Sequence, residues 1–107
     1  MNAITLISDK AILTARIAHE ERVVVYAMTP WSGPCRMATV SIAQLANEYS
    51  KRLTFYQVDL EATPSIAGLF TITTVPTLLL FEAGQLKRTV VGLWPKETIA
   101  EKLEVLL

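Results

Sequence analysis

The feature of this sequence that most restricts its fold is an uninterrupted apolar run from Val23 to Met28, with the letters VVVYAM. Three β-branched residues in succession favour a strand over a helix. Because every side chain of such a strand avoids water, the strand belongs in the interior of a sheet that is covered on both faces. That pattern is typical of parallel sheets. The run therefore predicts a central strand with helices packed on both sides of it.

The segments on the N-terminal side of this strand predict one strand and one helix. Residues 2–7 (NAITLI) are expected to form a short strand. Ser8 is the expected N-cap of a helix that continues to about His19, since serine is among the preferred capping residues. The apolar stripe of that helix is expected to comprise Ile12, Leu13, Ile17 and Ala18.

A second helix and a third strand are expected after the central strand. The helix follows the stretch Trp31–Cys35 (WSGPC) and continues to about Ser50. Residues 53–59 (LTFYQVD) alternate well enough to predict a strand. The apolar face of the helix is expected to comprise Met37, Val40, Ile42, Leu45, Ala46 and Tyr49, which fall mostly on one side.

The C-terminal third predicts two helices and a hairpin. Thr63-Pro64 has the pattern of an N-cap followed by proline at the first helical position, so a short helix is expected over about 65–70. Strands are expected at 77–81 and 86–91, joined by a turn, and Pro95 begins a last helix with Ile99, Leu103 and Leu106 as its apolar row. Strands and helices that alternate in this order predict an α/β fold: a central mixed sheet of about five strands, flanked by about four helices.

Length and composition indicate a single domain and argue against several classes of function. A chain of 107 residues, 51% of them hydrophobic, is expected to fold as a single domain, 1–107, around a substantial core. Ten basic residues balance ten acidic ones without a long block of either sign. This balance argues against binding to nucleic acid or to an anionic membrane surface. No segment approaches the roughly 20 apolar residues that a membrane span requires.

Cysteine and histidine are too scarce for several kinds of site. One cysteine cannot form an internal disulfide, and one histidine, His19, far from it in the chain does not predict a metal site. The first residues lack the charged leader, apolar core and cleavage site of a signal peptide. We therefore expect a cytoplasmic protein without a bound metal or cofactor.

The stretch WSGPC raises the central question about function. With sulfur in place of the Ser32 oxygen it would read WCGPC, which is a dithiol redox motif. Considered without that comparison, Ser32 is a good helix N-cap and Cys35 is a small buried apolar residue. The sequence thus allows either a redox site whose nucleophile is absent or a serine-capped helix that carries a cysteine.

Four landmarks together resemble the thioredoxin family over nearly the whole chain. They are WSGPC followed by Arg36-Met37, Val75-Pro76-Thr77 before an apolar strand, the turn at 82–84, and Val91-Gly92 after the last strand. A lone C-x-x-C motif is a weak signal, but four landmarks in the expected order and spacing are a strong one. The resemblance implies the thioredoxin fold, with a cis peptide bond before Pro76.

The resemblance also implies roles for individual residues. Position 32 corresponds to the nucleophilic cysteine and Cys35 to the resolving thiol, so this pair would be catalytic. Gly33 and Pro34 complete the active-site loop, and Trp31, Val75, Pro76 and Gly92 would form the substrate-binding surface. Proteins of this family reduce protein disulfides and receive electrons from a thioredoxin reductase, and these are the partners that the resemblance implies, for a chain that we expect to be a monomer.

Two positions depart from the family pattern besides position 32. The family usually has a buried aspartate where this chain has Tyr26, and commonly a lysine nearby where it has Gln57. In the family the buried aspartate helps to remove the proton of the resolving cysteine, and the lysine commonly lies near that aspartate. Both positions of this proton relay are therefore altered in the present chain. Because one buried charge without its partner costs several kcal/mol, whereas the loss of both can be nearly neutral, the two changes make sense together.

Two functions from different classes remain open at this point. The first is a thioredoxin-type disulfide oxidoreductase in which this chain is disabled at Ser32, since a serine hydroxyl is not ionised at neutral pH without a strong base beside it. The alternative is a redox-inactive thioredoxin-fold binding module or structural subunit. Ser32 itself could be an engineered replacement, a natural loss of activity, or part of an activity that needs one cysteine.

Overall fold

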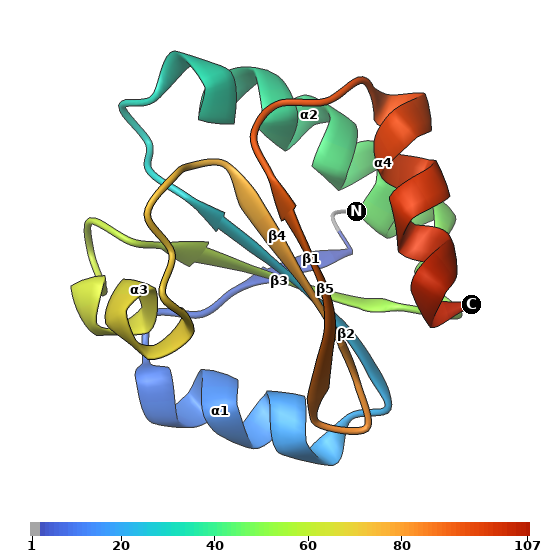
Figure 1. Ribbon diagram of the computed structural model, residues 1–107, viewed down its shortest axis with the longest axis horizontal. Helices are drawn as coiled ribbons and strands as arrows, with labels where there is room; N and C mark the ends of the chain where they lie inside the picture. Colours follow the sequence, from blue (N-terminus) through green and yellow to red (C-terminus); the bar gives the residue numbers. More distant parts are fainter. Residues whose placement is uncertain (1–2) are drawn as a thin grey trace.

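The computed structural model describes residues 3–107 as one twisted five-stranded sheet covered by helices (Figure 1). The strand order is β1-β3-β2-β4-β5, with β1, β3 and β2 parallel and β4 and β5 antiparallel to their neighbours. The strands are β1 (Ile4–Leu6), β2 (Arg22–Met28), β3 (Thr54–Asp59), β4 (Thr77–Glu82) and β5 (Gln85–Val91), and the helices are α1 (Lys10–His19), α2 (Gly33–Glu48), α3 (Pro64–Phe70) and α4 (Lys96–Leu103), followed by a short 3₁₀ turn at Glu104–Leu106. The prediction of a mixed α/β sheet is confirmed.

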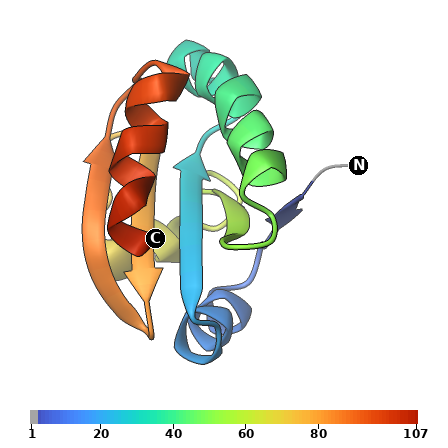
Figure 2. The same ribbon diagram turned by 90° about the vertical axis from the view of Figure 1, so that its right-hand side faces the viewer.

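Strand β2 occupies the centre of the sheet, as the apolar run predicted. Its residues from Val23 to Met28 are all buried. Val24, Tyr26 and Met28 belong to the core beneath α2 and α4, whereas the residues between them belong to the core beneath α1 and α3. Figures 1 and 2 show these two helical layers on opposite sides of the sheet.

The prediction for α1 was wrong at its cap and along part of its stripe. Asp9, not Ser8, is the N-cap, because its carboxylate accepts a hydrogen bond of 2.9 Å from the Ile12 N–H group. Of the four expected apolar positions, only Leu13 and Ile17 are buried, and the remaining two, Ile12 and Ala18, are exposed. Ile12 and Ala18 are each next to one of these buried residues in the chain, so helix geometry turns them about 100° away from the buried row.

The buried face of α2 was predicted only in part. Met37 and Val40 are exposed, and the helix ends at Glu48 rather than near Ser50. The residues that the helix buries are Cys35, Ala38, Ile42, Leu45 and Ala46. Because successive helical residues are turned by about 100°, the side chains next to this row point toward solvent.

Three smaller corrections concern the ends of elements. Strand β1 is shorter than the expected 2–7, and residue 2 lies outside the described residues. The Thr63 side chain does not cap α3; its hydroxyl donates to the Ser8 carbonyl instead. Pro95 is the N-cap of α4 rather than its first residue, and the expected apolar row of that helix is buried.

Candidate active site

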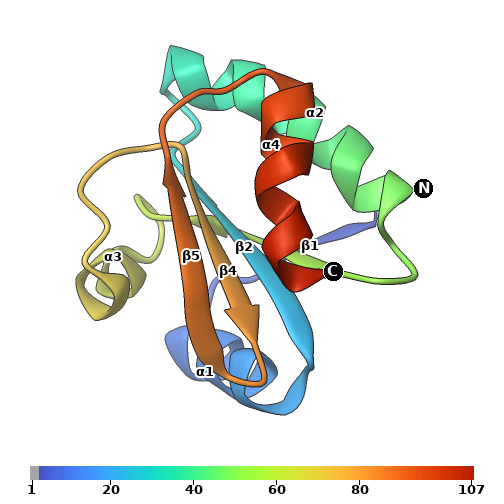
Figure 3. The same cartoon turned by 45° about the vertical axis from the view of Figure 1, so that its right-hand side comes forward.

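Strand register brings three separate segments together at one end of the sheet. Ala27 at the end of β2 pairs with Thr77 at the start of β4, and Thr77 pairs with Val91 at the end of β5. The loop before α2, the segment before β4 and the segment after β5 must therefore lie side by side, as Figure 3 shows. The Gly92 N–H group donates to the Pro76 carbonyl over 2.8 Å, which joins two of these segments directly.

The backbone at this end has two special conformations. The Val75–Pro76 peptide bond is cis, which confirms the expectation for this proline. Gly92 has a φ of 94°, in a region that favours glycine because a side chain would be strained there. Pro76 is buried and Val75 is partly exposed. The sequence prediction that Val75, Pro76 and Gly92 are neighbours therefore agrees with the geometry.

Ser32 is the N-cap of α2. Its hydroxyl oxygen accepts a hydrogen bond of 3.2 Å from the Cys35 N–H group, and its carbonyl accepts one of 3.0 Å from the Arg36 N–H group. The residue is only 7% exposed. The hydroxyl thus satisfies one of the free N–H groups at the helix start. It is held as a capping acceptor, which agrees with the simpler of the two interpretations of this serine.

Cys35 lies beneath the loop, in the first turn of the helix, and is 0% exposed. It packs in the core under α2 together with Tyr26 and Ala38. Gly33 precedes it and is partly exposed, and among the described residues no atom beyond its chain neighbours and its own helix backbone lies within 4 Å of the position that a Gly33 Cβ would occupy. The surface of the site therefore has room at Gly33, whereas the Ser32 and Cys35 side chains are buried.

Tyr26 contacts the start of α2 through its hydroxyl. The phenol donates to the Cys35 carbonyl over 2.8 Å and lies 2.9 Å from the Thr39 hydroxyl, which itself donates to the same carbonyl over 2.8 Å. Burial raises the pKa of Tyr26 to about 12, although the bond with Thr39 acts in the opposite direction. At neutral pH Tyr26 is therefore a hydrogen-bond donor and cannot accept a proton as the usual aspartate does.

Gln57 lies beside Tyr26, because the two residues are register partners on β3 and β2. Unlike Tyr26, Gln57 is partly exposed. It lines a groove of about 370 Å³ together with Met28, Pro30 and Asp59. The two positions of the usual charged relay are thus adjacent, as expected, and both are neutral.

Apolar side chains are exposed around the site. Trp31 is 67% exposed, and Leu93 and Trp94 follow Gly92 with more than two fifths of their surface in contact with solvent. The sequence interpretation named Trp31 but missed Leu93.

The sequence interpretation also missed Thr39. The spacing of Thr39, four residues after Cys35 on a helix, was the available signal, since threonine hydroxyls at that spacing can reach the earlier carbonyl.

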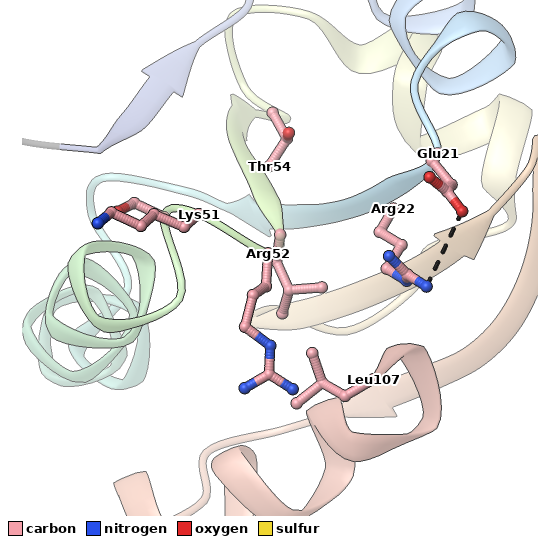
Figure 4. A pocket seen from close by; sticks show the side chains of 8 residues that line it. Glu21, Arg22, Lys51, Arg52, Thr54 and Leu107 are labelled. Carbon is pink, nitrogen blue, oxygen red and sulfur yellow. Dashed lines mark ion pairs between the residues drawn. The ribbon is translucent and has the colours of Figure 1, made fainter.

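A separate hollow lies at the other end of the sheet. It measures about 420 Å³ and includes Arg22, Lys51 and Arg52 (Figure 4). Arg22 is already paired at 3.8 Å with both Glu21 and Glu82, and Figure 4 shows the Lys51 ammonium group pointing away from the two arginines. Its cations therefore do not converge on one point, and we assign no site to it.

The described residues contain neither a cluster of metal ligands nor a membrane-spanning helix. Across residues 3–107, His, Cys, Asp and Glu side chains form no group of three or more that could hold a metal ion. The same part of the chain contains no helix with the length and apolar character to cross a bilayer.

Comparisons with known proteins agree with this geometry. The chain is 35% identical over 104 residues to the M-type chloroplastic thioredoxin of Pisum sativum, a match that covers 97% of this chain and 60% of that protein. It is 39% identical over 82 residues to thioredoxin 1 of Synechococcus elongatus, covering 77% of each. The solved thioredoxin of Malassezia sympodialis is 25% identical and superposes with a TM-score of 0.89 over 100% of this chain and 94% of that one.

The matches differ in how much of each relative they include. The chain spans 60%, 51% and 59% of the length of the first three curated relatives, which are chloroplastic M-type and M4 thioredoxins. The thioredoxin family model matches residues 4–105, which is almost the whole chain. With a family match of this extent, and with the expected cis Val75–Pro76 bond at the end of the sheet where β2 leads to α2, this chain belongs to the thioredoxin family.

Proposed function

We propose that the chain carries the site of a thioredoxin-type thiol–disulfide oxidoreductase and that Ser32 disables it in dithiol turnover. The observation that carries this proposal is the position of Ser32. It begins α2, stands three residues before Cys35, and lies at the end of the sheet where the cis Val75–Pro76 bond is found. This is the place at which the family holds its nucleophilic cysteine.

A cysteine at position 32 would meet favourable conditions for reaction. The first turn of a helix presents N–H groups and the positive end of the helix dipole, both of which stabilise a thiolate. Such a thiolate attacks one sulfur of a substrate disulfide and forms a mixed disulfide, while the other substrate sulfur leaves as a thiolate. Cys35 then attacks the mixed disulfide, closes a 32–35 disulfide and releases the second substrate sulfur as a thiolate.

The surface around position 32 fits an extended disulfide-containing segment of a protein. Val75 is partly exposed beside the site, Trp31 offers an apolar face, and the absence of a side chain at Gly33 leaves room for a partner backbone. Disulfide-containing proteins as substrates and a thioredoxin reductase as electron donor are the partners that we propose, in a cytoplasmic setting.

The block in the present chain follows from the chemistry of the two residues. The Ser32 hydroxyl is a capping acceptor, and within residues 3–107 it has no basic partner to remove its proton, while Cys35 is closed to solvent. A hydroxyl cannot form a disulfide, and a single thiol cannot cycle between dithiol and disulfide. We therefore expect this chain to bind near the cis proline without reducing what it binds.

Trapping of a mixed disulfide tests the role of position 32. In a Ser32→Cys/Cys35→Ala variant, the new thiolate is expected to attack a peptide disulfide, and the adduct should persist because no second thiol can resolve it. Intact mass spectrometry would detect the adduct. The chain with Ser32 and the Cys35→Ala single variant are the matched controls, and neither should form it. A folded double variant that forms no adduct would contradict the assignment.

The second candidate is a redox-inactive binding module or structural subunit. The observation that favours it is that Tyr26 and Gln57 leave the interior without a charged relay, while apolar residues such as Trp31 and Trp94 remain exposed. A stoichiometric partner that stays bound to the chain with and without reductant would support this role. Loss of every partner at micromolar concentration would remove its main support.

A further inference from the structure

The start of α2 is tied to the centre of the sheet by hydroxyl groups. Tyr26 projects from β2, is 0% exposed, and donates to the carbonyl of Cys35, which belongs to the first turn of the helix. Thr39 closes a triangle of three oxygens, with separations of 2.8, 2.8 and 2.9 Å. A carbonyl with two hydroxyl donors is held more firmly than one that has only its helical partner.

This arrangement acts on the one thiol of the chain. Moving the Cys35 thiol toward solvent requires the first turn of α2 to lift from the sheet. That movement would break the bond from the Tyr26 phenol, because the phenol is fixed to β2 in the middle of the core. The bond from Thr39, in contrast, lies within the helix and could travel with it.

We propose that Tyr26 is a positioning residue of the Ser32–Cys35 site: through the Cys35 carbonyl, its hydroxyl holds the first turn of α2 closed over the Cys35 thiol. The proposal refers to the site of the proposed function, but it does not require that the chain reduce disulfides. It gives the neutral tyrosine a role at the position where the family usually has an aspartate. Here the residue restrains the thiol and does not remove its proton.

The matched control is another buried tyrosine. Tyr56 is 4% exposed and donates its hydroxyl to Glu20, in the core on the opposite face of the sheet. Tyr26→Phe removes the buried bond to the Cys35 carbonyl and the contact with Thr39, and Tyr56→Phe removes one part-buried bond to a carboxylate, so both changes should lower global stability. Only the Tyr26 hydroxyl, however, contacts the helix turn that covers Cys35.

The experiment measures the rate at which iodoacetamide alkylates Cys35 in the native chain, followed by intact mass. Because Cys35 is the only cysteine, each alkylation reports a single site. We expect Tyr26→Phe to accelerate alkylation about fivefold, as expected for the loss of one neutral hydrogen bond from the closed state, and Tyr56→Phe to leave the rate unchanged. Urea unfolding of each variant supplies the global stability for comparison.

Two outcomes would overturn the proposal. Equal acceleration by both Tyr→Phe changes would mean that Cys35 reacts only through global unfolding. No acceleration by Tyr26→Phe would mean that its hydroxyl does not restrain the turn. If Tyr26→Phe does not fold, Thr39→Val and Thr39→Ser provide a second comparison. Only the valine variant loses the 2.9 Å contact between the Thr39 hydroxyl on the helix and the Tyr26 hydroxyl on the sheet, so only that variant should react faster. An inactive Ser32→Cys protein would refute the proposed function without changing any of these rates.

Discussion

Replacing Tyr26 with aspartate, the residue usual in the family, is expected to destabilise this chain by several kcal/mol at neutral pH. The side chain is fully buried beside Gln57, which is neutral and offers no opposite charge. An unpaired buried carboxylate costs about 3–5 kcal/mol. Folded domains are stable by only about 5–15 kcal/mol, so the variant should be marginal.

The appropriate control is Tyr26→Asn, which leaves the same cavity without the charge. Urea unfolding should show the aspartate variant less stable than the asparagine variant at neutral pH. Burial raises the pKa of the folded carboxyl above its unfolded value of about 3.9, so the folded state binds more protons. The difference between the variants should therefore grow as pH rises above about 4 and disappear below it. Equal stability at neutral pH would contradict the argument.

A double variant tests whether the two neutral residues depend on each other. Gln57 lines a groove open to solvent, so a lysine there could place its ammonium group beside the new carboxylate without full burial. Tyr26→Asp/Gln57→Lys is therefore expected to recover part of the stability that Tyr26→Asp loses, whereas Gln57→Lys alone should change little. If the double variant is no more stable than the single aspartate variant, the two positions are not coupled.

Reverting Ser32 to cysteine is expected to produce a reversible internal disulfide. Position 32 already directs its side chain to the Cys35 N–H group, three residues along the same helix start. With oxidised glutathione, the two cysteine thiols should form one disulfide while the glutathione disulfide is reduced to two thiols. Intact mass after alkylation in denaturant, where the buried Cys35 thiol is accessible, would then show two modified cysteines in the reduced variant and none in the oxidised one.

The chain with Ser32 provides the control for this prediction, because its single buried thiol can form at most a mixed disulfide with glutathione. A folded Ser32→Cys variant whose cysteines both remain open to alkylation after oxidation would mean that the two side chains cannot meet. Dithiothreitol should restore both thiols in the oxidised variant.

Much of the fold could be predicted because local patterns and tertiary packing agree. The β-branched run from Val23 to Met28 has one favourable environment, the centre of a covered sheet, and that is where it lies. The capping role of Ser32 was likewise predictable, because the helix that follows it needs an acceptor for a free N–H group in its first turn. The cis bond at Pro76, in contrast, was predicted by family resemblance alone, since most X–Pro bonds are trans.

The parts that the sequence did not predict depend on how elements dock. Met37 and Val40 have the character of core residues but lie outside the row that contacts the sheet. The contact of Tyr26 with Thr39 depends on where the start of α2 settles above β2, which neither segment determines alone. Exposed apolar residues next to a site break the usual pattern because a partner, not the core, is expected to cover them.

Reductase-coupled reduction of insulin disulfides, followed through NADPH consumption, would decide whether Ser32 alone separates this chain from an active enzyme. The Ser32→Cys protein is expected to turn over, whereas the chain with Ser32 should not differ from a reaction without it. Circular dichroism would first confirm that both forms are folded. A folded Ser32→Cys protein that reduces insulin no faster than free dithiothreitol would contradict the oxidoreductase assignment and leave the binding module as the better account.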